Sequence, residues 1–232
     1  MICEVKSLSK TYGQGQIEVK ALDRLSLTIE KGEFTAIVGP SGSGKSTLLH
    51  LMGGLDKPSA GEVFLSGNSL FSMKPGELSN FRRDHIGFIF QSYNLIPVLS
   101  AAENVEYILL LQNRPAQERT KMVKAALASV GLEGLENRRP NQLSGGQQQR
   151  VAVARAIASH PNLILADEPT ANLDSKTGWE LIEMMRRLNE KSGVTFVFST
   201  HDPKIIESAK RLVYIRDGKI EKDTNRLNEV RP

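Results

Sequence analysis

Residues 39–47 are GPSGSGKST, and their types and spacing are those that bind phosphate. Gly39, Gly42 and Gly44 let the backbone curl tightly, so that successive N–H groups can point at one anion. Lys45 adds a mobile positive charge for β- and γ-phosphates, and the hydroxyl of Ser46 is a ligand for Mg²⁺. We therefore expect this loop to hold the phosphates of a nucleoside triphosphate. Its candidate contacts are Gly39, Pro40, Ser41, Gly42, Ser43, Gly44, Lys45, Ser46 and Thr47.

The segments on either side of this loop support the same interpretation. An apolar strand is predicted at 34–38, and a helix-forming run follows at 48–52. The N-terminus of a helix carries about half a positive charge, so it would face the same anion as the glycines. The simpler alternative is a glycine-rich turn with a chance lysine. A strand before the loop and a helix after it favour phosphate binding.

Two adjacent carboxylates, Asp167 and Glu168, follow another apolar strand at 163–166. Ligands of parallel sheets collect at the carboxyl ends of the strands, so both acids should face the phosphate-binding loop. There Asp167 would hold Mg²⁺ through water, and Glu168 would polarise the water that attacks the γ-phosphate. Adjacent acids are common in proteins, and it is the upstream loop that favours a catalytic role for this pair.

The elements that must position these groups are visible as two kinds of apolar pattern. Short continuous runs at 34–38, 86–90, 163–166 and 195–198 are typical of strands buried on both faces of a parallel sheet. Helical patterns separate the runs, which predicts a βαβ core. By contrast, the first 30 residues alternate, as antiparallel strands do. Additional strand signals are a short run at 62–66 and a closing hairpin at 212–220 that turns at Asp217-Gly218.

Residues from about 95 to 159 contain no convincing strand. Ser100 and Glu103 form a capping box ahead of an apolar helical pattern, so a helix should begin there. Two more helices are predicted at 116–130 and 147–159. This block is therefore expected to be a helical insertion into the parallel core.

The bulk composition is that of an ordinary globular protein, with 24% charged and 40% hydrophobic residues. The net charge of +4, from 30 basic and 26 acidic residues, is too mild to indicate nucleic-acid binding. A single cysteine, Cys3, fits a reducing compartment. No N-terminal signal is evident, and no apolar run approaches the roughly 20 residues of a membrane span. These features predict a cytosolic protein.

The segment Leu143-Ser144-Gly145-Gly146-Gln147 is the most discriminating stretch of the chain. Two glycines at the start of a helix form a second anion-binding helix terminus, with Ser144 as an additional donor. A flexible N-terminal cap is the simpler alternative. The pentapeptide LSGGQ and the residues after it resemble the signature of the ATP-binding cassette (ABC) ATPases.

The resemblance covers almost the whole chain and implies roles for further residues. Tyr12 is similar to the aromatic residue that stacks on adenine, and Gln91 to the glutamine that senses Mg²⁺ and the γ-phosphate. His201 resembles the switch histidine, and the segment 171–174 resembles the loop that ends in Asp174. In this family two chains pack head to tail on ATP, so that the signature acts on the partner's phosphate-binding loop. The additional nucleotide contacts implied are Tyr12, Ser144, Gly145, Gly146, Gln147 and Asp174.

Within the family, IGFIFQSYNLIPVLSAAENVE at 86–106 resembles the macrolide-export and lipoprotein-release branch, whose members work with FtsX-like permeases. The resemblance implies an ATPase with ATP and Mg²⁺, a homodimer with ATP, and integral membrane permease subunits. It also implies a peripheral position on the cytoplasmic face of the inner (plasma) membrane, export or release as the direction, and no direct contact with nucleic acid.

The fold class that follows is α/β. We expect a P-loop NTPase core with a parallel sheet, an N-terminal antiparallel β subdomain and an inserted α-helical subdomain. The chain would form a single ABC ATPase domain over 1–232. The core and the antiparallel β subdomain would take about 1–94 and 160–232, and the helical subdomain about 95–159.

Other functions share part of this pattern. A cassette ATPase acting on DNA or ribosomes is the main alternative. However, DNA-repair relatives carry long coiled coils between the loop and the signature, whereas this gap holds about a hundred residues without heptads. Relatives that act in translation carry two cassettes, and this chain has one. Small-molecule kinases and GTPases would share the phosphate-binding loop but do not need LSGGQ.

The apolar segment 93–99 follows Gln91 and allows two interpretations. Its side chains either fill the core of the helical insertion or line an exposed groove that receives a short helix of the permease. In the second case Leu95 and Val98 would contact the permease.

Overall fold

The computed structural model describes residues 1–13 and 18–226 of the chain. Its larger sheet has six strands in the order β10-β9-β3-β8-β7-β6. The pairs from β9 to β6 are all parallel, and β10 adds an antiparallel edge. The predicted parallel core is thereby confirmed. The strands are β3 (Phe34–Val38), β6 (Ile86–Ile89), β7 (Leu163–Asp167), β8 (Thr195–Thr200), β9 (Arg211–Arg216) and β10 (Lys219–Asn225).

The second sheet is antiparallel, in the order β2-β1-β4-β5. Its strands are β1 (Cys3–Tyr12), β2 (Val19–Ile29), β4 (Ala60–Leu65) and β5 (Asn68–Ser69). The alternating pattern of the first 30 residues therefore predicted the strand type correctly. Cys3 is fully buried in β1, and this burial raises the pKa of its thiol to about 12.

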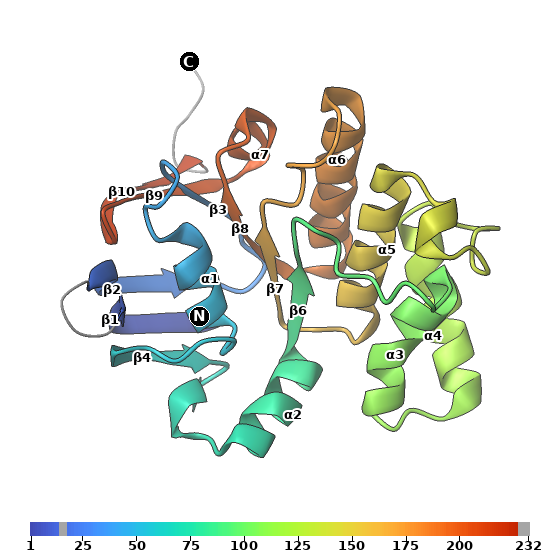
Figure 1. Cartoon of the computed structure of the whole chain (residues 1–232), viewed down its shortest axis with the longest axis horizontal. Coiled ribbons are helices and arrows are strands. Elements are labelled where there is room, and N and C mark those ends of the chain that lie inside the picture. Colours follow the sequence, from blue (N-terminus) through green and yellow to red (C-terminus); the bar gives the residue numbers. More distant parts are fainter. Residues whose placement is uncertain (14–17, 227–232) are drawn as a thin grey trace.

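The helix α1 (Lys45–Met52) lies between the two sheets (Figure 1). It begins three residues earlier than predicted, at the lysine of the phosphate-binding loop. Its apolar side chains share a core with both sheets, to which β7 contributes Leu163 and Leu165. Ile164 and Ala166 point to the opposite face of the sheet and join the other core cluster. The continuous apolar runs thus reflect burial on both faces, as expected.

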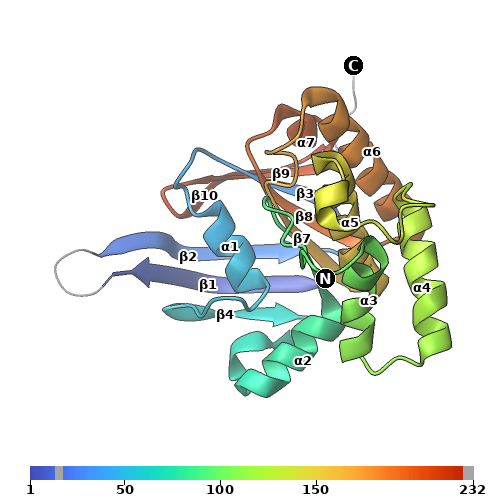
Figure 2. The same ribbon diagram turned by 45° about the vertical axis from the view of Figure 1, so that its right-hand side comes forward.

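The second core cluster packs helices against the other face of the parallel sheet. Three of these helices lie between β6 and β7, where every residue from 90 to 162 is described and none is in a strand. Figure 2 shows α4 on the outer side of this block. The helices in the cluster are α3 (Ala101–Leu111), α4 (Ala116–Ser129), α5 (Gly145–Ala158), α6 (Ser175–Ser192) and α7 (Pro203–Ser208). Outside it lie α2 (Pro75–His85) and two 3₁₀ turns, Leu70–Ser72 and Pro140–Gln142.

The helix starts explain where sequence and structure differ by a few residues. The capping box predicted at Ser100 is present, since the Glu103 N–H donates to the Ser100 hydroxyl at 3.2 Å. Helix α5 begins two residues before the predicted position, because Ser144 caps it in the same way. The subdomain boundaries at 94/95 and 159/160 stay a prediction, and residues 227–232 lie outside the described residues.

Over residues 1–13 and 18–226, no helix combines the length and the apolar character needed to cross a membrane.

The buried side chain of Asn189, near the end of α6, joins three segments of the core. It is 3% exposed. Its Nδ2 donates to the carbonyl oxygens of Gly32 at 2.9 Å and Val194 at 2.8 Å. These carbonyls belong to the turn before β3 and to the residue before β8. The side chain therefore fixes how the last turn of α6 meets the two central strands.

We predict that Asn189→Ala lowers the free energy of unfolding by about 1–3 kcal/mol, because the partly buried carbonyls of Gly32 and Val194 lose their donor. Urea titration followed by circular dichroism measures the change, provided that the m-value stays constant. Asn137→Ala, at an exposed position, is the matched control and should change stability by less than about 0.5 kcal/mol. Equal stability of the two variants would contradict the role assigned to Asn189.

Candidate active site

The loop between β3 and α1 packs closely against neighbouring backbone. A Cβ atom placed on Gly39 would lie 2.1 Å from the carbonyl oxygen of Ile215, which no side chain tolerates. Gly44 has φ of +101°, and its Cβ would lie 2.4 Å from the carbonyl oxygen of Ala21. Close approach therefore requires glycine at both positions, and at Gly44 the left-handed backbone conformation requires it as well. From behind, the Gly218 N–H donates to the Ser43 carbonyl at 3.1 Å.

Lys45 supplies the positive charge of this loop, and it is only 7% exposed. Its Nζ donates to the carbonyl oxygens of Gly39 at 2.8 Å and Pro40 at 2.9 Å. No carboxylate pairs with it among the described residues. The buried hydroxyl of Ser43 likewise has no hydrogen-bond partner there. A positive charge without a counterion and an unpaired hydroxyl fit a site that accepts phosphate oxygens.

Ser46 and Asp167 are in direct contact. The Ser46 hydroxyl donates to Asp167 Oδ1 at 2.9 Å, across 121 positions of sequence. On the other side, His50 Nε2 lies 3.9 Å from Asp167 Oδ2. A hydroxyl and a carboxylate are the oxygen ligands that Mg²⁺ prefers. The two side chains thus fit the metal site expected from the sequence.

Glu168 and His201 form the second pair of the site. Glu168 Oε1 lies 2.7 Å from His201 Nδ1, and the Thr200 hydroxyl donates to Oε2 at 3.2 Å. Glu168 has φ of +44°, a left-handed conformation that is unfavourable for a glutamate. Its N–H donates to the Ser199 carbonyl at 2.9 Å, which holds it in that conformation. The structure therefore orients this carboxylate at a conformational cost, as active sites do.

The phosphate-binding loop, Gln91, Glu168 and His201 line one cavity of about 380 Å³. They come from the carboxyl ends of β3, β6, β7 and β8, where the parallel arrangement places them together. The loop residues on its wall are Ser41, Gly42, Ser43, Gly44, Lys45, Ser46 and Thr47. The side-chain amide of Asn172 donates to the Gln91 carbonyl at 3.0 Å and so connects the segment after β7 to the segment after β6.

Tyr12 lies beside this cavity and not on its wall. It is 41% exposed, and its hydroxyl donates to Asp56 Oδ2 at 2.8 Å. Burial and this bond raise the pKa of the phenol, while the hydroxyl of Thr47 lowers it. Lys10 Nζ lies 4.7 Å from the ring centroid. The ring is therefore held at the end of the phosphate-binding loop.

The signature residues are not brought to the cavity of their own chain. Ser144 accepts from the Gln147 N–H at 3.3 Å, and Gln147 Oε1 accepts from the Ser144 N–H at 2.9 Å. The helix cap considered above is therefore present. A Cβ on Gly146 would lie 2.4 Å from Thr177 Cγ2, so the glycine lets α5 approach α6. Gly145 and Ser144 belong to the same exposed turn.

Asp174 begins the neighbouring helix and also lies away from the cavity. Its Oδ1 accepts from the N–H groups of Lys176 and Thr177 at 3.0 Å each. Hydrogen bonds from Thr177 and Lys176 hold the pKa of Asp174 below its usual range. The aspartate thus acts as an ionised helix cap in this structure.

Sequence reasoning missed two side chains that connect α5 to the site. Gln149 is fully buried and donates to the Pro169 carbonyl at 2.7 Å, one residue beyond Glu168. Arg155 donates to the carbonyls of Asn94 at 2.6 Å and Tyr93 at 2.9 Å. Burial lowers the pKa of Arg155. The available signal was polar side chains within the small apolar residues of QQQRVAVARAIA.

The family assignment rests on sequence comparison. The ABC transporter family matches residues 22–171, which is more than half of the chain and contains the loop, Gln91, the signature and the carboxylate pair. The chain belongs to the ABC transporter family. As such it is a cassette that binds and hydrolyses ATP.

Individual ABC relatives match along nearly the whole chain. The uncharacterized ABC transporter ATP-binding protein MJ0796 of Methanocaldococcus jannaschii is 47% identical over 224 residues, which are 95% of each protein. The macrolide export ATP-binding/permease protein MacB of Escherichia coli is 46% identical over 223 residues, which are 96% of this chain and 34% of MacB. This chain therefore corresponds to about a third of MacB.

Solved ABC structures have the same fold. A dimeric post-hydrolysis state of the ATP-binding cassette MJ0796, bound to ADP and Pi, superposes with a TM-score of 0.89 at 45% identity. The match covers 97% of this chain and 99% of that one. The predicted α/β class, with its P-loop core, antiparallel sheet and inserted helices, is thereby confirmed.

We predict that Tyr12→Ala raises KM for both ATP and GTP, because stacking on a purine does not depend on its hydrogen-bonding groups. Loss of stacking is worth about 1–3 kcal/mol, or roughly 5- to 150-fold in KM. Tyr12→Phe keeps the ring, loses the bond to Asp56, and should stay near the wild-type value. Steady-state assays with both nucleotides measure this. Strict selectivity for ATP would indicate a hydrogen-bonding base pocket instead.

Proposed function

We propose that this cavity performs Mg²⁺-dependent ATP hydrolysis with the residues described above. Lys45 and the loop N–H groups would bind the β- and γ-phosphates, and Ser46, Asp167 and Gln91 would hold the metal. When bound, the metal would neutralise charge that develops on the phosphates. Glu168 would accept the proton of the attacking water, and His201 would orient Glu168 and contact the γ-phosphate. The observation that carries this proposal is the convergence of the loop, Gln91, Glu168 and His201 on one cavity.

The position of the signature, with Ser144 exposed and Gly145 and Gln147 half-buried, supports a head-to-tail dimer. Ser144 and Gln147 begin α5 on the surface and do not line their own chain's cavity. In the proposed dimer, Ser144, Gly145, Gly146 and Gln147 of one chain would face the phosphate-binding loop of the other. Asp174 would lie at the same interface. The likeness to dimeric MJ0796 favours this arrangement.

The proposed partner is an integral membrane permease of the FtsX-like kind. MacB is named as both ATP-binding protein and permease, and this chain matches about a third of it. The protein would bind peripherally at the cytoplasmic face of the plasma membrane and drive export or release. A role on DNA has less support. The longest helix among the described residues has 18 residues, and no long coiled coil lies between the phosphate-binding loop and the signature, a stretch that the structure describes completely.

The segment after Gln91 divides between the two interpretations considered for it. Leu95 packs against the core of the helical block, so at this position the core-filling interpretation holds. Val98 is 70% exposed and is the most exposed large apolar side chain among the described residues. The buried side chain of Asn104 holds the turn between them, accepting from the Ile96 N–H at 2.8 Å.

Further exposed apolar side chains lie on the helix that follows. Tyr107, Leu110 and Leu111 on α3 are 45–47% exposed. Exposed apolar groups gathered within one short segment are typical of a protein contact. We therefore propose that residues 98–111 contain the surface that receives a short permease helix, as an apolar helix-in-groove contact would.

We predict that Glu168→Gln reduces turnover by roughly 10²–10⁴-fold, the usual contribution of a general base, while ATP still binds. Because ATP is then not consumed, the variant should accumulate as an ATP-dependent dimer, measured by light scattering. Glu133→Gln, at an exposed position outside the cavity, is the control and should behave as wild type. A Glu168→Gln protein that stays monomeric in saturating Mg-ATP would rule out the proposed dimer.

We predict that Val98→Asp spares ATP hydrolysis by the isolated chain and abolishes copurification with the permease from detergent-solubilised membranes. Binding should be lost because the new carboxylate would be buried without a partner in the apolar contact with the permease. Val19→Asp makes the same change at a valine that is 60% exposed on β2 and should leave copurification intact. Leu95→Asp should instead unfold the helical block. Unchanged permease binding by Val98→Asp would refute the proposed surface.

A further inference from the structure

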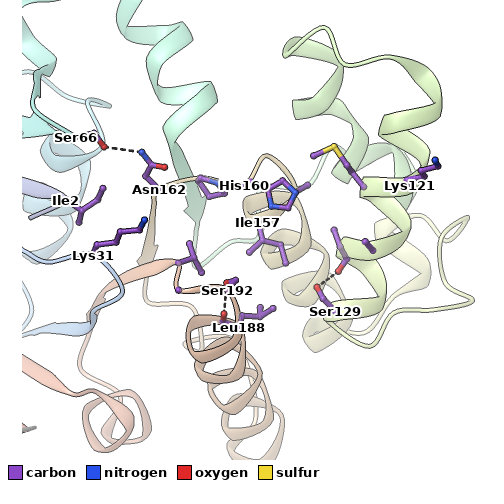
Figure 3. Close-up of a pocket in the computed structure, with 17 residues that line it drawn as sticks. Ile2, Lys31, Ser66, Lys121, Ser129, Ile157, His160, Asn162, Leu188 and Ser192 are labelled. Atoms are coloured by element: carbon purple, nitrogen blue, oxygen red, sulfur yellow. Dashed lines mark hydrogen bonds between the residues drawn. The ribbon is translucent and has the colours of Figure 1, made fainter.

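A second cavity lies at the edge of the parallel sheet where the strands begin, opposite the edge that carries the active site. Its volume is about 770 Å³, twice that of the nucleotide cavity. Asn162 and Val194, the residues before β7 and β8, are on its wall, whereas the active site follows the ends of the same strands. Its other walls come from α4 and from the ends of α5 and α6 (Figure 3). A volume of this size is typical of sites for small molecules, which span roughly 300–1,000 Å³.

The inner surface of this cavity is mostly apolar. Met122 on α4, Ile157 on α5, Leu188 on α6 and Val194 contribute aliphatic side chains. All four are only partly buried and pack against the helical core from its edge. If the helices and the sheet packed together without a gap, these four side chains would be fully buried. The cavity thus offers an apolar volume whose natural complement is an aliphatic body.

The charges around the cavity have one sign. Lys31, in the turn before β3, and Lys121, on α4, stand on opposite sides of it (Figure 3). Neither lysine forms a salt bridge within the described part of the chain, and none of the described lining residues is acidic. His160 adds a ring nitrogen on the same wall. An anionic group on the ligand would therefore meet two unpaired lysines and no acidic residue among the described residues of the cavity wall.

We propose that this cavity binds an amphiphilic anion, namely an alkyl chain that carries a single carboxylate. The chain lies among Met122, Ile157, Leu188 and Val194. The carboxylate stays at the rim, where the positive charges of Lys31 and Lys121 both attract it while their ammonium groups remain in water. None of the residues involved belongs to the nucleotide site, so the proposal stands independently of the catalytic one. It assigns a second small-molecule site to the cassette.

The test uses the full chain, decanoate below its micellar concentration and isothermal titration calorimetry. Decanoate should bind saturably, with one molecule per chain and a negative heat-capacity change from apolar burial. Decyltrimethylammonium has the same alkyl chain with a cationic head and should not bind. Equal binding of both amphiphiles, or no saturable binding of decanoate, would overturn the proposal.

Two sets of variants test whether the ligand lies in this cavity. Ala125 is an exposed residue on the cavity wall, and Ala125→Trp should abolish binding by filling the space. Ala116→Trp, on the same helix and outside the cavity, should not. Lys31→Glu and Lys121→Glu should each weaken binding roughly two- to fivefold, as loss of an exposed ion pair does. Lys124→Glu, one turn away and outside the wall, is the control.

A spectroscopic measurement keeps the proposal testable if Ala125→Trp fails to fold. With ¹³C-labelled methionine methyl groups, decanoate should shift the Met122 signal, which Met122→Leu assigns by its disappearance. Decanoate that shifts other methionine signals and leaves that of Met122 unchanged would place the ligand elsewhere and refute the site.

Discussion

The whole nucleotide site depends on how closely one stretch of backbone can approach another. The loop after β3 is wedged between the carbonyl groups of β2 and β9, and only glycine at 39 and 44 leaves room for this. The N–H groups of the loop take their direction from that contact. Residues with no chemistry of their own, such as Ala21 and Ile215, would therefore determine where phosphate oxygens lie in the proposed site. Hydrogen bonding from the β9–β10 turn holds the loop from behind.

The parallel sheet then brings four further side chains to this loop, although most of them are far apart in the sequence. Gln91, Asp167, Glu168 and His201 are separated by up to 110 positions, yet each lies at or just beyond the carboxyl end of a strand. Parallel strands share one edge for these ends, so the order of strands replaces proximity in sequence. This arrangement has a conformational cost at Glu168, whose backbone is held in a left-handed conformation by its hydrogen bond to β8.

Local patterns predicted the helices α1, α3, α4 and α5 and every described strand except the short β5, because each of these depends on neighbours within a few positions. Leu95 and Val98 show where such patterns stop: both are apolar, but only packing against the helical block distinguishes the buried one from the exposed one. The same holds for Asn189 and Gln149, whose partners lie far away in the chain. The second cavity also could not be predicted, since its walls come from helices and turns that the sequence does not relate.

Helix α5 has a mechanical consequence. It runs for 14 residues, or about 20 Å, from the signature turn to the region where Arg155 holds the carbonyls of Tyr93 and Asn94. A rigid rod of this kind transmits displacement in both directions. In the proposed complex, a displacement of the segment after Gln91 by the partner would reach Ser144 through this helix, and a displacement of Ser144 would reach that segment in return. If the two ends are coupled in this way, any effect of the partner on nucleotide affinity would be matched by an equal effect of the nucleotide on partner affinity.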